Sequence, residues 1–223
     1  MTTFRIRPLL RDALLLGGAA SVFVTAAALG NARTKDVTRP PPSVGLRDVA
    51  SFGRIANPAQ RSAALFTEAG KVIESPRCMN CHPRTRRPTQ GDDMHPHNPP
   101  MFAGAEGRGM PSLACSTCHG PDNVATLAAG IKSIPGDPHW GLAPTSMAWQ
   151  GLPLAAICEQ IKDPRRNGNR SLDQIWHHMA EDHLVGWAWR PGEGRRSAPG
   201  TQAQFGRIVR AWIDTGAHCP KLR

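Results

Sequence analysis

Apolar residues recur at helical spacing in four segments of this chain, and the first two lie on either side of a long aperiodic region. An amphipathic helix is expected over residues 59–75, because Asn57 suits the N-cap and Pro58 suits the first helical position. A shorter helix is expected over residues 152–163, and Pro164 stops it.

The other two segments lie near the C-terminus and carry clearer end signals. A helix over residues 172–182 is expected to open on the capping-box pair Ser171 and Gln174. The last helix is expected over residues 201–216, with Gly216 as its C-cap. Their apolar faces comprise Leu172, Ile175, Trp176 and Met179 in the former, and Phe205, Ile208, Val209, Trp212 and Ile213 in the latter.

The remaining sequence predicts loops. Residues 33–57 are polar and proline-rich and predict a linker, and residues 83–114 predict a loop with no strand or long helix. No strand-like alternation persists anywhere, and the chain holds 22 glycines and 21 prolines. The predicted fold class is therefore mostly α with long irregular loops.

The N-terminal residues resemble an export segment. Residues 1–32 combine a basic start, an apolar stretch and small residues, with candidate cleavage sites after Ala28 and Ala32. An uncleaved membrane anchor is the alternative, although glycines interrupt the apolar stretch. Either way the rest of the chain is expected to leave the cytoplasm, for the periplasm, and only an uncleaved segment would hold it at the membrane.

A repeated C-x-x-C-H pattern is the main chemical signal. It comprises Cys78, Cys81 and His82 in the first copy, and Cys115, Cys118 and His119 in the second. A thioredoxin-like dithiol needs a βαβ setting, and a zinc ribbon needs two pairs about 15–20 residues apart. Covalent attachment of c-type haem explains the cysteines as thioether sites and each histidine as the proximal iron ligand. Two covalently attached haems are thus expected.

The copies lie 37 residues apart, from Cys78 to Cys115, so a complete single-haem domain does not fit between them. Both haems are expected in one compact multihaem cytochrome c-like domain over residues 58–223. Six tryptophans follow residue 139 and suit packing around flat rings.

Each iron in an electron-transfer protein needs a sixth ligand. Among the nine histidines, His97 and His139 are the first candidates, followed by His178 and then His95. His177 and His178 are adjacent on a predicted helix, so only one of them easily faces a haem. The competing methionine ligands are Met101, Met110 and Met147.

Cys158 and Cys219 stand outside the motifs. In an oxidising compartment two such cysteines predict a disulfide, which would hold the C-terminal helix to the body of the protein. Use of one thiol as a haem ligand is the alternative.

The formal net charge is +10. Because the basic runs are scattered over loops without interleaved aromatic residues, nucleic-acid binding is not expected. Solvated surface charge explains these runs, and a basic face for an acidic redox partner is the functional alternative.

Several stretches resemble a known family, among them "CMNCHP", "GDDMHPHNPP", "CSTCHG", "PHWGLAP" and "HHMAEDHLVGWAWRPGEGR". They are similar to small exported dihaem cytochromes of proteobacteria, often labelled as a subunit of isoquinoline 1-oxidoreductase, a molybdenum hydroxylase. The resemblance covers residues 76–220. It implies a cytochrome that accepts electrons from a dehydrogenase and passes them to a downstream acceptor. Any molybdenum chemistry would belong to a partner, because this chain has no features of a molybdopterin or iron–sulfur subunit.

Three functions follow from the sequence. The first is a dihaem electron carrier with no catalytic residues. The second is a small haem enzyme, a peroxidase or oxyanion reductase, in which Glu181, Asp182 or His183 would serve as acid–base groups beside an open iron. The third is a zinc-bound structural module.

Overall fold

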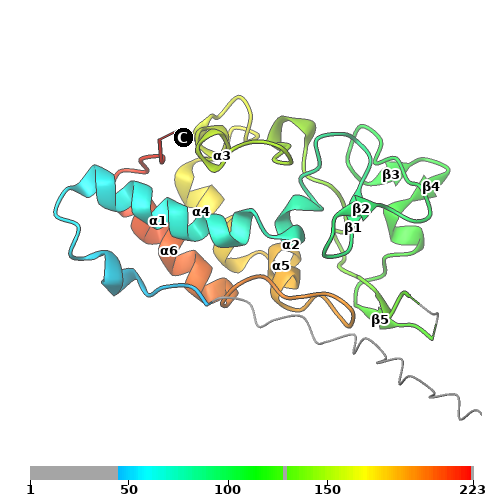
Figure 1. The fold of residues 1–223 in the computed structure, drawn as a ribbon. Coiled ribbons are helices and arrows are strands. Elements are labelled where there is room, and N and C mark those ends of the chain that lie inside the picture. The colour runs from blue at the N-terminus through cyan, green and yellow to red at the C-terminus, as the bar shows by residue number, and fades with distance from the viewer. Residues whose placement is uncertain (1–44, 128–129, 222–223) are drawn as a thin grey trace, which may run out of the picture. The chain divides into compact units, whose positions relative to one another are not determined.

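The computed structural model describes residues 45–127 and 130–221 and contains six α-helices (Figure 1). The α-helices are α1 (Pro58–Ile73), α2 (Pro76–Met79), α3 (Leu154–Lys162), α4 (Leu172–Glu181), α5 (His183–Gly186) and α6 (Gln202–Asp214). Four 3-10 turns accompany them, η1 (Val49–Phe52), η2 (Cys115–Thr117), η3 (Thr145–Met147) and η4 (Trp187–Trp189). The mostly α-helical prediction is compatible with this content.

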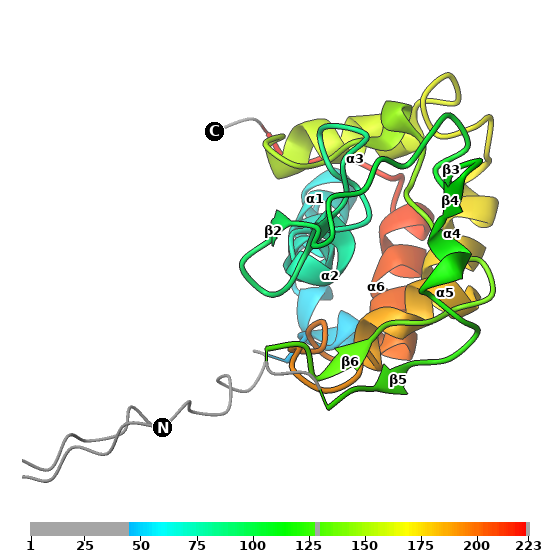
Figure 2. The same ribbon diagram turned by 90° about the vertical axis from the view of Figure 1, so that its right-hand side faces the viewer.

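The core lies where α6 packs against both α1 and α4, and Figure 2 shows α6 between them. The apolar face predicted for the last helix is the buried face of α6, with Trp212 fully buried and Phe205 2% exposed. Trp212 also packs on Phe66 of α1, with ring centres 4.9 Å apart. Burial of these large side chains is the main stabilising contribution of the helical layer.

The helix ends follow the predicted capping residues. The Asn57 side chain accepts a hydrogen bond from the Gln60 amide at 3.0 Å at the start of α1. Ser171 and Gln174 form a reciprocal capping box at the start of α4. The C-cap of α6 is Thr215, and Gly216, which was expected in that position, follows it with a φ of +103°, which a residue with a side chain rarely adopts. The N-terminal caps are confirmed, and the C-terminal cap differs from the prediction by one residue.

The loops are more structured than expected. Three two-stranded antiparallel ladders pair β1 (Thr89–Gln90) with β2 (His95–Pro96), β3 (Gly109–Met110) with β4 (Leu113–Ala114), and β5 (Val124–Ala125) with β6 (Ser133–Ile134). Four of these strands fall within residues 83–114, which were predicted to have none. Two-residue strands are too short to produce a hydrophobic alternation, which is why the sequence did not indicate them.

A second difference concerns the stretch after α4. It belongs to the remaining sequence, for which loops were predicted, but it contains α5 and η4. The Asp182 side chain accepts hydrogen bonds from the Leu184 and Val185 amides, at 2.9 and 3.3 Å, and this cap starts α5.

Only part of the predicted N-terminal organisation lies in the described region. The export segment and residues 33–44 of the linker lie outside it. Residues 45–57, predicted as linker, instead pack on the helices, with Phe52 1% exposed in the core. Glu68 of α1 holds this segment, because its carboxylate accepts from the Arg47 amide at 2.8 Å and the Arg47 side chain at 2.9 Å. No helix in the described region is long and apolar enough to cross a membrane.

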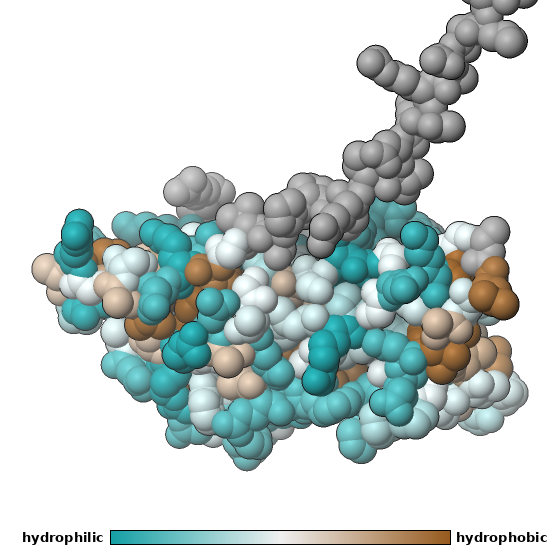
Figure 3. Space-filling view, turned by 90° about the horizontal axis from the view of Figure 1, so that it is seen from below, coloured by the Kyte–Doolittle hydropathy of each residue, from teal (hydrophilic) through white to brown (hydrophobic). Residues whose placement is uncertain are grey.

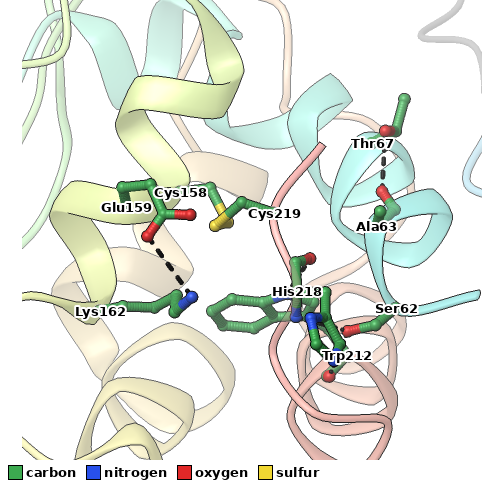
Figure 4. Close-up of a disulfide and its surroundings, with 9 residues drawn as sticks. All are labelled: Ser62, Ala63, Thr67, Cys158, Glu159, Lys162, Trp212, His218 and Cys219. Atoms are coloured by element: carbon green, nitrogen blue, oxygen red, sulfur yellow. Dashed lines mark hydrogen bonds and ion pairs between the residues drawn. A yellow bond between two sulfur atoms is a disulfide. The ribbon is translucent and has the colours of Figure 1, made fainter. Parts of the chain in front are cut away.

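The predicted disulfide between Cys158 and Cys219 is present and joins α3 to the segment after α6 (Figure 4). Ser62 of α1 reinforces the same region. Its hydroxyl donates to the Trp212 carbonyl at 2.9 Å and accepts from the His218 amide at 2.9 Å. The C-terminal segment is therefore fixed to two helices.

The large exposed apolar residues are concentrated in one stretch of the chain. In the described region all of them lie between Met94 and Ile131, which contains the second C-x-x-C-H motif. Figure 3 shows part of this apolar surface at the edge of the molecule near β5, where Val124 is 55% exposed.

Candidate functional site

The first C-x-x-C-H motif is built on α2. Pro76 takes the first helical position, and the His82 amide donates to the Cys78 carbonyl at 3.1 Å, which extends the turn beyond α2. This turn places both cysteines and the histidine of the motif in the wall of one cavity.

That cavity has a volume of about 480 Å³ and is bounded by the helical core. Its wall is largely apolar and includes Ile73, Met147, Ile175, Met179, Trp187 and Phe205. Such a lining suits a large, mainly apolar ligand.

His82 is held in a defined orientation and protonation state. Its Nδ1 lies 2.6 Å from the Met147 carbonyl oxygen. A carbonyl only accepts hydrogen bonds, so Nδ1 carries the proton and Nε2 keeps a free lone pair. The ring also stacks on Trp149, with centres 3.5 Å apart and planes 5° from parallel. Burial lowers the pKa of His82 to about 4, so the ring is neutral at neutral pH, as a metal ligand must be.

His119 of the second motif repeats this arrangement. Its Nδ1 donates to the Pro135 carbonyl at 2.7 Å, so Nε2 is again free. Its ring stacks on Trp140, with centres 4.9 Å apart and planes 17° from parallel. Burial lowers the pKa of His119 as well. Both motif histidines thus have the same surroundings, with Nδ1 on a backbone carbonyl and one ring face on a tryptophan.

The two motifs differ in how far they are enclosed. Burial raises the pKa of Cys78 to about 12 and that of Cys81 to about 11, so both thiols are neutral at neutral pH. Cys78, Cys81 and Cys115 are half-buried, whereas Cys118 is exposed. The second motif is therefore the more exposed of the two.

Among the predicted sixth ligands, His97 lies beside His119 with ring centres 5.9 Å apart and planes at 61°. The His97 Nδ1 donates to the Pro99 carbonyl at 2.8 Å, which leaves its Nε2 free. The structure thus brings together one proximal candidate and one distal candidate of the second motif.

His178 lies in the wall of the cavity that contains His82, and its charge contributes to the lowered pKa of His82. Its Nδ1 lies 3.2 Å from an Asp182 carboxylate oxygen, a partner that orients the ring as carboxylates orient metal-binding histidines. The neighbouring His177 is 69% exposed and pairs with Glu181 at 2.5 Å outside this cavity. Only one of the adjacent histidines faces the cavity, as expected.

The other predicted ligands are less favourably placed. Both ring nitrogens of His95 have partners, Asp93 at 2.5 Å and Gln90 at 3.1 Å, so neither is free for a metal. His139 lies at the cavity wall but is an exposed residue.

The methionine candidates also differ in position. The Met147 carbonyl binds the ring of His82 and Met147 itself lines the cavity. Met110 is 42% exposed and Met101 is half-buried, and neither lines this cavity.

Sequence reasoning missed several residues of the site. It did not identify the carbonyls of Met147 and Pro135, the stacked rings of Trp140 and Trp149, or the buried side chain of Arg77 in the cavity wall. The tryptophan cluster after residue 139 was the one signal that pointed to part of this set.

Comparisons of this chain with models of protein families, with curated proteins and with solved structures found no match.

Within the described ranges, no group of three or more histidine, cysteine, aspartate or glutamate side chains is placed to hold a metal ion. A zinc site of the ribbon type requires four such ligands around one ion.

Proposed function

We propose that this protein is an exported dihaem c-type cytochrome that carries electrons between a dehydrogenase and a downstream acceptor. The thioether sites would be the cysteines at 78, 81, 115 and 118, and the proximal ligands would be His82 and His119. The supporting observation is the repeated preparation of these two histidines, each with Nδ1–H on a carbonyl, Nε2 free and one face on a tryptophan.

The residues around the first motif fit a haem. The cysteines and His82 line one largely apolar cavity of about 480 Å³, and the carbonyl of Met147 fixes the ring of His82. When bound, haem supplies an iron that changes oxidation state by one electron. The chain would hold the macrocycle, orient His82 and keep water away from it.

The second motif suits a bis-histidine iron. The ring centres of His97 and His119 lie 5.9 Å apart, and each ring keeps its Nε2 free, so the two histidines would be able to hold one iron together. We assign His97 as the sixth ligand of that haem.

For the first motif we assign His178 as the sixth ligand, because it shares the cavity with His82 and its Nδ1 is held by Asp182. Two histidine ligands per iron leave no open position for a substrate, which favours electron transfer over peroxidase or reductase chemistry. His139 remains the alternative at the same cavity wall.

A compact multihaem arrangement is supported by the position of both motifs in one unit, Pro40–Arg223. The exposed Cys118 makes the second motif the more accessible of the two, so we propose that electrons are exchanged with the partner proteins there. One of these partners would be a dehydrogenase, such as the molybdenum hydroxylase that the sequence resemblance implies.

The test is spectroscopic, on protein made with a haem-ligation system and exported. Two low-spin haems whose spectra do not change with carbon monoxide, cyanide or peroxide are expected. A stable high-spin haem in the resting oxidised protein, or turnover of peroxide or nitrite above that of a haem peptide, would replace the electron-carrier proposal with the enzyme alternative.

A further inference from the structure

Arg77 is a charged residue in an apolar wall. It lies on α2 directly before Cys78, its side chain is 1% exposed, and it lines the cavity of the first motif. Sequence reasoning gave it no role. A guanidinium in such a place needs hydrogen-bond acceptors for its N–H groups, because burial removes the water that would otherwise supply them.

Its contacts satisfy only one of its three nitrogens. Nη2 donates to the Gly91 carbonyl and to an Asp92 carboxylate oxygen, both at 2.8 Å. Nε and Nη1 are buried and have no hydrogen-bond partner in the described part of the chain. Trp149 Nε1, another donor of the cavity wall, is unpaired in the same sense. The cavity wall thus contains hydrogen-bond donors that have no acceptor within the described part of the chain.

The local charge is also unbalanced. Asp92 pairs with Arg77 and also with Arg196 at 3.1 Å, so one carboxylate serves two guanidinium groups. Arg195 lies close enough for its charge to interact with those of Arg77 and Asp92. Burial lowers the pKa of Arg77 and the Asp92 charge opposes this shift. Three cations around one anion leave a net positive charge, which a second anion would balance.

We propose that Arg77 binds a carboxylate in the cavity through Nε and Nη1, and that this carboxylate is a propionate of the haem at Cys78 and Cys81. This assignment rests on the proposed function, because it needs the haem in the cavity. A guanidinium–carboxylate contact is a charge-assisted hydrogen bond, and it is strengthened where water is excluded.

A carboxylate fits these observations better than a bulkier anion. The wall also contains Arg108 and Arg170 but is mainly apolar, so a mainly apolar ligand that carries a negative charge fits it. A haem has this distribution of polarity. The second haem also carries propionates, and a variant without that haem separates the two sources.

The test compares Arg77→Gln with Arg196→Gln in the full-length protein carrying its haems. Both variants remove a cationic partner of Asp92, but Arg196 is not in the cavity wall, so it is the matched control. Haem content is measured first, by the pyridine haemochrome assay. Resonance Raman spectra then report the propionate bending bands, and potentiometry reports the midpoint potential of each haem.

Arg77→Gln is expected to shift the propionate bands of one haem and to lower its midpoint potential, because a positive charge near the iron favours the reduced state. Arg196→Gln should leave the bands in place. Arg77→Lys keeps the charge but not the guanidinium geometry, so it should shift the bands with a smaller change in potential. It also provides a readout if Arg77→Gln does not fold.

Two results would overturn the assignment. One is a full haem content with unchanged bands and potentials in both Arg77 variants. The other is a band shift that vanishes when Cys115→Ser and Cys118→Ser remove the second haem, since the carboxylate would then belong to that haem. Absence of covalent haem in the unmodified protein would instead refute the proposed function itself.

Discussion

Removal of the disulfide should destabilise the protein by an amount that the loop length predicts. The bond joins Cys158 and Cys219 across a sequence separation of 61 residues. In the chain-entropy treatment, closing a loop of this length lowers the conformational entropy of the unfolded chain. This raises the free energy of the unfolded state by about 4 kcal/mol at 25 °C. We expect Cys158→Ala with Cys219→Ala to lower the free energy of unfolding by about this amount.

The assay is equilibrium unfolding in urea, followed by tryptophan fluorescence. Trp212 is a suitable reporter, because it is fully buried and its indole Nε1 donates to the His218 carbonyl at 3.1 Å, next to the disulfide. Thioether-bound haem would stay attached in the folded and the unfolded chain, so its covalent contribution is the same in both proteins compared.

The control is Cys158→Ser with Cys219→Ser, which also removes the disulfide and should unfold at the same urea concentration as the alanine variant. The denaturant dependence should be larger in the variant, because an unlinked chain exposes more surface on unfolding. A loss of stability below about 1 kcal/mol would contradict the reasoning, since the loop would then not restrict the unfolded chain as the entropy treatment requires.

Two further predictions concern Glu68 and His97. Although burial raises the pKa of Glu68, hydrogen bonds and charge from Arg47 and Lys71 outweigh it and lower that pKa. The carboxylate therefore stabilises the fold above its unfolded-state pKa, and the contribution is lost as pH falls through the folded-state pKa. Glu68→Gln should cost about 1–3 kcal/mol at pH 7 in urea unfolding, and progressively less as the pH falls from the unfolded-state pKa to the folded-state pKa; a pH-independent difference would refute the ionic account. His97→Ala should convert one haem, that on His119, to a high-spin form visible by electron paramagnetic resonance, while His95→Ala leaves both haems low-spin. Low-spin spectra for both haems in His97→Ala would exclude His97 as a ligand.

The long helices could be predicted because their information is local. Asn57 and the pair Ser171 and Gln174 cap their helices through side chains within three residues in the chain. The short elements could not be predicted in this way. α5 depends on one cap by Asp182, and the two-residue ladders have no periodicity to detect.

The candidate site likewise has a part that depends on local sequence and a part that depends on contacts between distant residues. The spacing within each C-x-x-C-H motif is local, so the sequence alone shows it. The groups that orient the histidines are not local, because the Met147 carbonyl is 65 residues from His82 and the Pro135 carbonyl is 16 residues from His119. Their positions follow from packing.

The choice between neighbouring ligands illustrates the limit of sequence reasoning. His95 and His97 are two residues apart in the same proline-rich loop, and nothing in the sequence separates them. In the structure both nitrogens of His95 have partners, whereas Nε2 of His97 is free beside His119. The difference arises from which groups surround each ring.

Arg77 is a similar case. An arginine next to a cysteine in a short helix would ordinarily be expected at the surface. Instead its side chain is 1% exposed and donates to the Gly91 carbonyl and the Asp92 carboxylate, 14 and 15 residues away in the chain.

The most direct test of the central claim is the number of covalently bound haems per chain. Intact-mass measurement with a pyridine haemochrome assay should find two in the exported protein. One should remain when either Cys78 and Cys81 or Cys115 and Cys118 are replaced by serine, and two should remain when Cys158 and Cys219 are replaced by alanine. A chain without covalent haem after export through a functioning ligation system, or a chain that holds zinc at these cysteines, would contradict the account.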